Sequence, residues 1–399
     1  MKSAAPPLPA TIWVLGCVSL LMDLSSEMVH ALLPVYLVGT LGVSALMVGL
    51  IDGAAEATAL ATRVFSGLLS DWWGRRKPLA LLGYGLGAAS KPLFALAGGP
   101  GLVLGARLLD RFGKGLRGAP RDALVAEHAP AGRRGEAFGL RQALDTVGAF
   151  LGPLLAVALM LAWSDDVRAV FWVAAIPGAL AVLLLALGVR EAPRAATAPA
   201  VNPLSRVSLA RLPAAYWRLV AVGSLFALAR FSEAFLLLRA QQGGLGLAWV
   251  PLVLIALNGV YAASAYPAGR LADRMDRRTL LALGLLVLVA ADLALAGAEA
   301  GPWLWAGVAL WGLHLGLTQG LLAAQVADAA PPALLGTAYG FFNLASGAAL
   351  LLASAAAGLI WDLAGARWTF VAGAALALLA LAALAVLPHT AAPAVRTAP

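Results

Sequence analysis

The stretch GLLSDWWGRRK at residues 67–77 returns in altered form as GRLADRMDRR at residues 269–278, displaced by 202 residues. Each copy begins with glycine, holds an aspartate four residues later and contains a pair of arginines after that. A second related pair occupies residues 125–139 and 326–340, where VAE and GEAFG become VAD and GTAYG at a displacement of 201 residues. A chain of 399 residues that repeats itself at half its length is predicted to contain two similar halves in tandem.

Long apolar runs surround these stretches. Of the 399 residues, 61% are hydrophobic and 12% are charged, whereas about a quarter of the residues of a soluble domain are charged. The runs are about 18 to 25 residues long, close to the roughly 20 that a helix needs to cross a bilayer. Lipid offers no hydrogen-bond partners, so each run is predicted to be a helix, and the short alternating segments of a β-barrel are missing. The sequence therefore predicts an all-α polytopic membrane protein with twelve spans, at residues 11–37, 44–69, 79–98, 101–126, 137–161, 168–188, 215–238, 246–270, 280–298, 302–326, 337–360 and 368–388.

Basic residues gather in alternate joints between these spans, as in Arg75 to Lys77 and Arg277 to Arg278. Because basic loops stay in the cytoplasm, both termini are predicted to be cytoplasmic, in a bacterial-type inner (plasma) membrane. The net charge of +8 is thereby explained by orientation, and no nucleic-acid partner is expected. The longest joint, residues 189–214, is rich in Ala, Pro and Arg and is predicted to be a flexible cytoplasmic linker. It would connect an N-terminal six-helix bundle, residues 1–188, with a C-terminal one, residues 215–399.

Residues 67–77 resemble the loop motif between helices two and three of the major facilitator superfamily, G-x-L-[AS]-D-x-x-G-R-R-K. The resemblance implies the fold of that family, with two six-helix bundles related by a pseudo-two-fold axis and a transport path between them. It also implies that Asp71 and Arg75 belong to a conformational latch. The second copy departs from the motif, because Asp276 stands where glycine is expected. The residues assigned to the latch are Gly67, Asp71, Gly74, Arg75, Arg76, Gly269 and Asp273.

Two further stretches resemble motifs of the same family. Arg111, followed by Gly115, is similar to the basic-residue motif of its fourth helix. Gly148, Gly152 and Pro153 in the fifth helix look like the motif of its proton-linked exporters, although the glycine pair usual farther along is absent here. Small residues spaced four apart are also ordinary helix-packing positions in membranes. Both interpretations of the helix-five motif stay open.

Ionisable residues inside the predicted spans line up along single helix faces. Asp23, Glu27 and His30 fall within one sector of the first helix, because an α-helix turns by about 100° per residue. An ionised side chain in mid-membrane costs roughly 2.5–3.5 kcal/mol even on a lenient scale, so such stripes are expected to face protein or a wet cavity. Further stripes comprise Asp52, Glu56 and Arg63 in the second span, Asp110, Lys114, Arg117 and Arg121 with Arg107 and Arg111 in the fourth, and Arg230 with Glu233 in the seventh.

The internal repeat shows which charged residues the helical architecture does not require. A shift of 201 residues places Trp311 and Thr318 where Asp110 and Arg117 stand, so the second half builds the same helix without those charges. Because only the first half carries these charges, a role in substrate binding or ion coupling is favoured for them. Structural ion pairing is the alternative. Proton coupling is assigned to Asp23, Glu27, His30, Glu56 and Glu233, and the substrate path to Asp110, Arg111, Lys114, Arg117, Arg230, Asn258, Tyr261 and Gln319.

The predicted function is proton-coupled export of a small organic solute or drug by alternating access. The alternatives are uptake or exchange of a small organic anion, divalent-metal export and, more remotely, a non-transporting membrane sensor. No enzyme activity and no cofactor are expected, because the chain has no phosphate-cradling glycine loop, nucleophile elbow or metal-hydrolase spacing. The expected partners are a small-molecule solute, protons and the lipid bilayer, and the functional unit is expected to be a monomer with no resident metal.

Overall fold

The computed structural model describes residues 8–73, 75–130, 133–190, 209–272, 275–298, 301–331 and 334–386, and all their regular structure is helical. The latch residues Gly74 and Asp273 lie outside these ranges. In the first half the elements are α1 (Ala10–His30), α2 (Leu33–Val35), the π-helical turn η1 (Tyr36–Thr40), α3 (Ala45–Trp73), α4 (Arg76–Leu96), α5 (Pro100–His128), α6 (Arg134–Ala162) and α7 (Val167–Gly188). In the second half they are α9 (Ala214–Ala229), α10 (Ala234–Gln242), the short 3-10 helix η2 (Leu247–Trp249), α11 (Leu252–Ala272), α12 (Arg277–Gly297), α13 (Pro302–Ala329), α14 (Leu335–Ala364) and α15 (Ala366–Val386).

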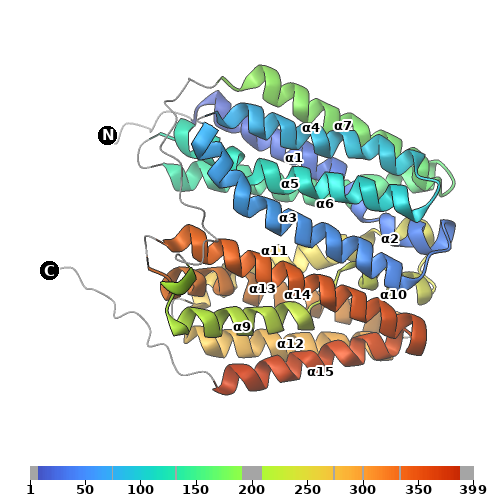
Figure 1. Cartoon of the computed structure of the whole chain (residues 1–399). Helices are drawn as coiled ribbons and strands as arrows, with labels where there is room; N and C mark the ends of the chain where they lie inside the picture. The colour runs from blue at the N-terminus through green and yellow to red at the C-terminus, as the bar shows by residue number, and fades with distance from the viewer. Residues whose placement is uncertain are drawn as a thin grey trace, which may run out of the picture.

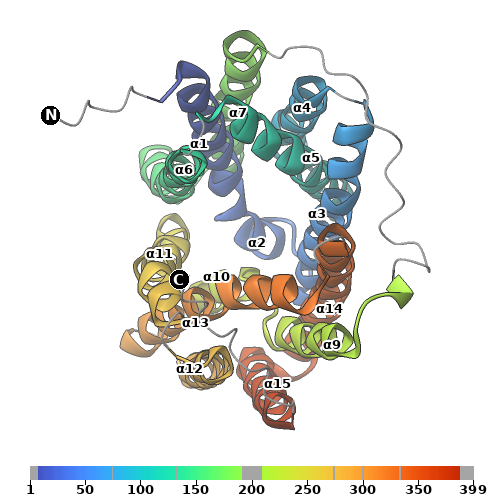
Figure 2. The ribbon, with the colours of Figure 1, turned by 90° about the vertical axis from the view of Figure 1, so that its left-hand side faces the viewer.

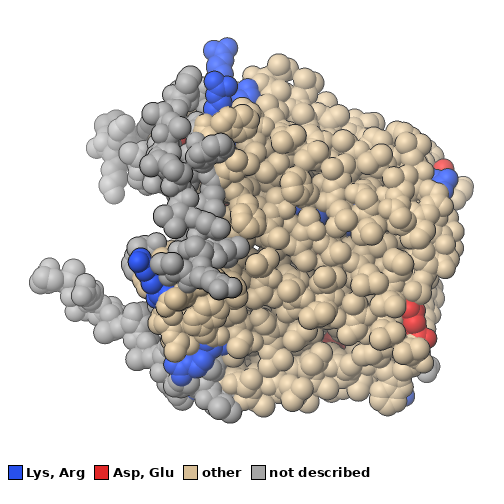
Figure 3. Space-filling model, viewed as in Figure 1, with Lys and Arg blue, Asp and Glu red and all other residues tan. Residues whose placement is uncertain are grey.

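Ten helical segments of the described residues are long and apolar enough to cross a membrane. The two other long helices, α5 and α13, are the fourth of each half and complete twelve spans, as predicted. The face of the molecule seen in Figure 3 carries almost no charged side chains across its middle, and lysine and arginine gather mainly at the end where both termini lie. This distribution suits a bilayer around the helices.

The helices form two bundles, α1–α7 and α9–α15 (Figures 1 and 2). Their main contact pairs α3 with α14, and a second contact pairs α6 with α11 (Figure 2). Both termini lie at one end of the molecule, the terminal end (Figure 1). The opposite end, formed by residues 41–44, 163–166 and 243–246, is the distal end.

Buried apolar side chains connect the bundles unequally along their length. One large cluster contains residues of both bundles, including Leu37 from η1 and Leu238 from α10 at the distal end. Toward the terminal end the buried apolar residues divide into two clusters, one around Leu15 in the first bundle and one around Tyr216 in the second. The bundles therefore share a hydrophobic core near the distal end and have separate cores near the terminal end.

Two spans are broken where the bundles meet. The first span breaks after His30, because Pro34 has no N–H to donate to the carbonyl of His30. The span predicted at residues 215–238 is present, but it is not one continuous helix, since the chain leaves helical geometry between Ala229 and Ala234. Ser232 Oγ accepts a hydrogen bond of 3.1 Å from the backbone N–H of Ala234, so a local cap replaces a helical bond there. An apolar run reveals the length of a span and gives little sign of such a break.

The internal repeat is visible in the packing. A Cβ added at Gly83 of α4 would meet Arg117 of α5, and one added at Gly284 of α12 would meet Thr318 of α13. Both members of these pairs differ by 201 residues, so α4 and α5 pack against each other in the register that α12 and α13 repeat.

Gly115 tests how much the fold depends on close helix approach. A Cβ at Gly115 of α5 would lie 2.6 Å from the Ala59 carbonyl oxygen and 2.7 Å from Thr62 Cβ, both in α3. Gly115→Val should therefore force α3 and α5 apart at a cost of about 1–3 kcal/mol. We expect the melting temperature of the purified protein in detergent to fall by roughly 5 °C. Gly105→Val in the same helix is the control, since a Cβ at Gly105 meets nothing within 4 Å; equal melting temperatures for the two variants would contradict the packing argument.

Candidate functional site

The intramembrane charges of the first bundle converge on α5. This helix packs against α3 and α4 and carries buried Arg107, Asp110, Arg111 and Arg117. Each of these side chains finds an oppositely charged partner on a neighbouring helix or on α5 itself. Charges inside a membrane domain require such pairing, because an isolated ion there has no water to solvate it.

Lys91 and Asp110 form the most deeply buried of these pairs. Lys91 Nζ of α4 lies 2.6 Å from Asp110 Oδ1, and the two side chains are 1% and 3% exposed. The ammonium also donates a 3.1 Å hydrogen bond to Ser26 Oγ of α1. Asp110, predicted to line the substrate path, is thus enclosed within the bundle. Lys91 was not among the predicted residues, although a single lysine within an apolar run of this length is itself a signal.

A second buried pair reaches across to the other bundle. Arg107 donates to Asp52 Oδ1 of α3 through Nη2 at 2.5 Å and Nε at 3.1 Å. The other Asp52 oxygen accepts a hydrogen bond from Ser232, in the break between α9 and α10. Ser232 also donates its backbone N–H to Ser354 Oγ of α14 at 3.1 Å. Asp52 therefore connects the charged core of the first bundle to the broken helix of the second.

Three other carboxylates are partly accessible, and they surround one lysine. The side chains of Asp23, Glu27 and Glu56 are 22%, 17% and 32% exposed. Lys114, one turn beyond Arg111, is exposed, and its charge acts on all three. We call these four residues the accessible cluster. The predicted proton-coupling residues Asp23, Glu27 and Glu56 are thus brought together, at positions that water can reach more readily than Asp110.

Each carboxylate of the accessible cluster has a nearby basic group. His30 Nδ1 lies 3.3 Å from Glu27 Oε2, one turn along α1. Arg111 Nε lies 3.2 Å from Glu56 Oε1 in an ion pair whose geometry is not that of a hydrogen bond. Asp23 Oδ1 is 4.0 Å from Arg117 Nη2. Long contacts of this kind are held less firmly than the 2.6 Å pair of Lys91.

Residues of the second bundle face the cluster from across the interface. Glu233, at the start of α10, interacts electrostatically with His30, Glu27 and Glu56 as well as with Arg230. Arg230 in turn acts on Glu56 and on Tyr261 of α11. Arg230, Glu233, Asn258 and Tyr261 are half-buried, and Gln319 of α13 is exposed. Of the predicted path residues of the second half, Arg230 at the α9–α10 break thus interacts with the first bundle, through Glu56.

The helix-five residues lie where α6 makes a close contact with α1. A Cβ at Gly152 would lie 2.8 Å from Glu27 Cβ, and one at Gly148 would strike the carbonyl oxygen of Leu20. Pro153 is buried beside Gly152. These residues allow α6 to lie directly against the stretch of α1 that carries Glu27, so a packing role explains their contacts.

At the terminal end, the basic motif residues tie helices of the first bundle together. Arg76 Nη1 lies 2.6 Å from Glu127 Oε1 of α5. Lys77 Nζ donates to the carbonyl oxygens of Ala186 and Val189, each at 2.6 Å. The other latch residues are less engaged in the described part of the chain: Arg75 and Gly269 are exposed, Gly67 is half-buried, and Asp71 lies in the last turn of α3 with its side chain outside the description.

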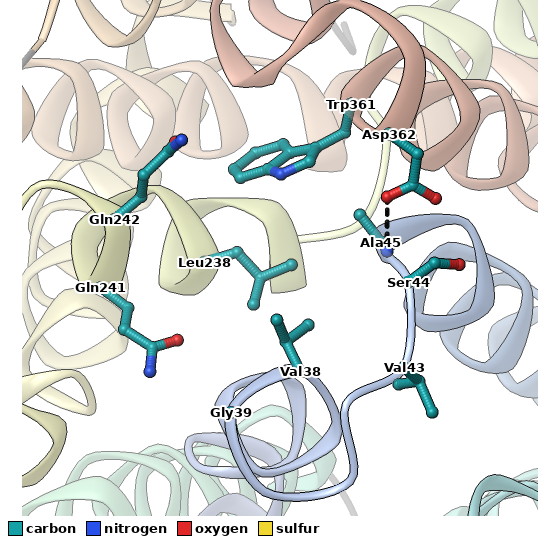
Figure 4. Close-up of a pocket in the computed structure, with 10 residues that line it drawn as sticks. All are labelled: Val38, Gly39, Val43, Ser44, Ala45, Leu238, Gln241, Gln242, Trp361 and Asp362. Atoms are coloured by element: carbon teal, nitrogen blue, oxygen red, sulfur yellow. Dashed lines mark hydrogen bonds between the residues drawn. The ribbon is translucent and has the colours of Figure 1, made fainter.

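A cavity of about 380 Å³ lies between the bundles at the distal end (Figure 4). One of its walls is Asp362 of α14, whose two carboxylate oxygens accept hydrogen bonds of 2.9 Å from the backbone N–H groups of Ala45 and Leu46. Those N–H groups open α3 in the other bundle, so Asp362 caps a helix across the interface. This contact was not predicted from the sequence. The cavity is lined by Val38, Gly39, Val43, Ser44, Ala45, Leu238, Gln241, Gln242, Trp361 and Asp362.

No group of three or more His, Cys, Asp or Glu side chains positioned to hold a metal ion occurs within the described residues. Asp23, Glu27 and His30 share a helix face without converging on one point suited to a metal.

Comparison with known proteins assigns the chain to a family. The model of the Major Facilitator Superfamily matches residues 15–354 and, in a second match, residues 244–399. An uncharacterized MFS-type transporter of Methanocaldococcus jannaschii is 32% identical over 366 residues, which cover 89% of each chain. The multidrug resistance protein MdtH of Yersinia pestis is 31% identical over 170 residues, 43% of this chain and 40% of that protein.

Among solved structures, the nucleoside transporter NupG, in its D323A mutant form, superposes with a TM-score of 0.76 at 13% identity, covering 94% of this chain and 99% of that one. This likeness shows the fold, and the sequence matches show the family. The chain belongs to the major facilitator superfamily and is a twelve-helix, multi-pass secondary transporter of that family.

Proposed function

We propose that this transporter exports a small organic solute in exchange for protons. The observation that carries the proposal is that the α9–α10 break meets the ionisable groups of the first bundle: Ser232 hydrogen-bonds to Asp52, and Glu233, the next residue, is within electrostatic range of Glu27 and His30 on α1. A proton taken up there acts on both bundles at once. That is what coupling requires, because a proton can drive a movement only if the two conformations bind it differently.

Glu27 is the group best placed to carry the proton. It is partly accessible, its contact with His30 is 3.3 Å long, and the charges of Lys114 and Arg111 act on it. Protonation would cancel these attractions and release α1 from them. Asp52 and Asp110, by contrast, are buried in shorter pairs with Arg107 and Lys91. We assign those two pairs a structural role.

The arrangement of the bundles supports alternating access. They share a hydrophobic core toward the distal end, whereas their buried apolar clusters are separate toward the terminal end. With the predicted orientation, the terminal end faces the cytoplasm, and the solute would enter there. Opening the distal end requires two contacts between the bundles to part, Asp52 with Ser232 and Asp362 with the start of α3.

The direction and the substrate class are supported by similarity and by charge. Export of a drug-like compound is in line with the partial similarity to a multidrug resistance protein. Exchange of an organic anion is the second candidate, and it is favoured by the exposed Lys114 and half-buried Arg230. Both candidates use the same accessible cluster.

Proton coupling through Glu27 is tested in proteoliposomes with an imposed pH gradient, screening drugs, organic anions and divalent metals for counterflow. Glu27→Gln should lower gradient-driven transport by about tenfold or more while exchange without a gradient persists, because the amide cannot bind the coupled proton. Glu136→Gln is the matched control, since Glu136 is 53% exposed and pairs with Arg133. If Glu27→Gln transports at the wild-type rate under the gradient, Glu27 does not take part in proton coupling.

The distal contact of Asp362 should bias the protein toward the closed distal end. Removing a helix cap costs roughly 1–2 kcal/mol, which corresponds to an equilibrium shift of about 5- to 30-fold. Leu238, only 4% exposed beside the cavity, can be replaced by cysteine in a Cys17→Ser background. In that background, Asp362→Ala should speed labelling by a membrane-impermeant thiol reagent added at the distal side. Asp165→Asn in an exposed distal loop is the control, because asparagine tolerates the positive φ of 66° at this position; an equal labelling rate in both variants would show that Asp362 does not hold this end shut.

A further inference from the structure

Asp292 of α12 is a buried carboxylate without a partner. Its side chain is 0% exposed, and neither oxygen has a hydrogen-bond partner among the described residues. The buried carboxylates of the first bundle, Asp52 and Asp110, each have a basic partner. Asp292 is therefore the exception among the buried carboxylates of the described chain.

The internal repeat shows what is missing beside it. The displacement of 201 residues that relates Gly83 to Gly284 also relates Lys91 to Asp292 and Asp110 to Trp311. In the first bundle these two positions hold an ammonium and a carboxylate 2.6 Å apart. In the second bundle they hold a carboxylate and an indole, so no positive charge balances the carboxylate. The indole Nε1–H of Trp311 is also buried without a partner among the described residues.

The surroundings of Asp292 are apolar and touch the broken helix. A Cβ at Gly373 of α15 would lie 2.7 Å from Asp292 Oδ2 and 2.8 Å from Cε1 of Phe231. Phe231 lies within the α9–α10 break, and its ring centroid is 5.3 Å from that of Trp311. Asp292 thus packs behind the segment whose next residue, Ser232, contacts Asp52 of the other bundle.

On the elements around Asp292, His314 of α13 and Arg230 beside the break are engaged elsewhere, and Arg367 of α15 is exposed. His314 of α13 is 2.8 Å from the Gly284 carbonyl oxygen through Nδ1, a contact in which the ring N–H donates. Arg230 acts on Glu233, Glu56 and His314. Within the described residues neither oxygen of Asp292 meets a charged or hydrogen-bonding group, since both are buried without a partner. An ionised carboxylate placed there would lose its hydration without gaining a hydrogen bond or an ion pair that offsets the loss.

We propose that Asp292 is a proton-binding site of the second bundle, separate from the accessible cluster. The proton on a carboxylate oxygen takes the place of the positive charge that Lys91 supplies to Asp110. The protonated side chain suits the packed, dry state of the α9–α10 break seen here, and release of the proton accompanies entry of water when that break moves. The coupling part of this inference rests on the proposed function, whereas the site can be tested without any solute.

Infrared spectroscopy of the full-length protein in lipid vesicles tests the site, because a protonated carboxyl group has a C=O stretching band that a carboxylate lacks. Wild-type protein at neutral pH should show such a band, Asp292→Asn should lose it, and Asp292→Glu should shift it. Asp165→Asn, in an exposed loop, should leave the spectrum unchanged.

An Asp292→Asn spectrum equal to that of the wild type overturns the proposal. So does an unshifted band in Asp292→Glu, a measurement that remains decisive if Asp292→Asn does not fold. If Asp292→Asn loses the band but the wild type shows no proton-driven transport, the site is upheld and the proposed function is refuted. If the wild type shows proton-driven transport but Asp292→Asn keeps the band, the proposed function is upheld and the site is refuted.

Discussion

The cost of an ionised group away from water governs this molecule. Placing one ion in mid-membrane costs about 2.5–3.5 kcal/mol even on a lenient insertion scale, and breaking a buried ion pair costs about 3–5 kcal/mol. The first bundle meets this cost by gathering its charges on α5 and pairing them with α3 and α4. Pairing at 2.6 Å, as between Lys91 and Asp110, fixes the helices. Longer and partly wet contacts, as at Asp23 and Glu56, leave groups that can still respond to a proton or a solute.

This division gives the two bundles different tasks. The second bundle repeats the helix packing of the first, with Thr318 in the place of Arg117, and needs no charged core to do so. Three of its ionisable groups, Arg230, Glu233 and Asp292, lie instead at or behind the α9–α10 break. The first bundle therefore contains the paired charges of α5, and the second contains the broken segment whose geometry depends on a local cap. A movement at the interface would change the geometry of that segment most, because a broken helix has fewer backbone hydrogen bonds that must be disrupted.

Much of the fold follows from the sequence, since the length and spacing of apolar runs reflect bilayer thickness and the motif repeats mark the two halves. The accessible cluster was also predictable in part, because Asp23 and Glu27 share a helix face. The partners were not: Lys91 meets Asp110 through the rotation and crossing of two helices, which hydrophobic periodicity leaves open. Asp292 escaped notice because a single acid in an apolar run forms no stripe. The Ser232 break was not predicted, because Arg230, Ser232 and Glu233 could equally lie within one turn of a continuous helix, and the cap depends on one hydroxyl.

The α3–α14 pair explains how the proposed movement can be both guided and reversible. Glycines make the contact close: a Cβ at Gly53 of α3 would lie 2.9 Å from Leu351 Cα, and one at Gly347 of α14 would lie 3.2 Å from Ala57 Cα. Because the two helices run antiparallel, Asp362 near the end of α14 meets the start of α3. The motif aspartate, Asp71, occupies the corresponding place at the other end of α3. On the proposed mechanism, one end is capped while the other opens. A cap worth about 1–2 kcal/mol suits that task, because a contact several times stronger would hold the transporter in one state whatever bound to it.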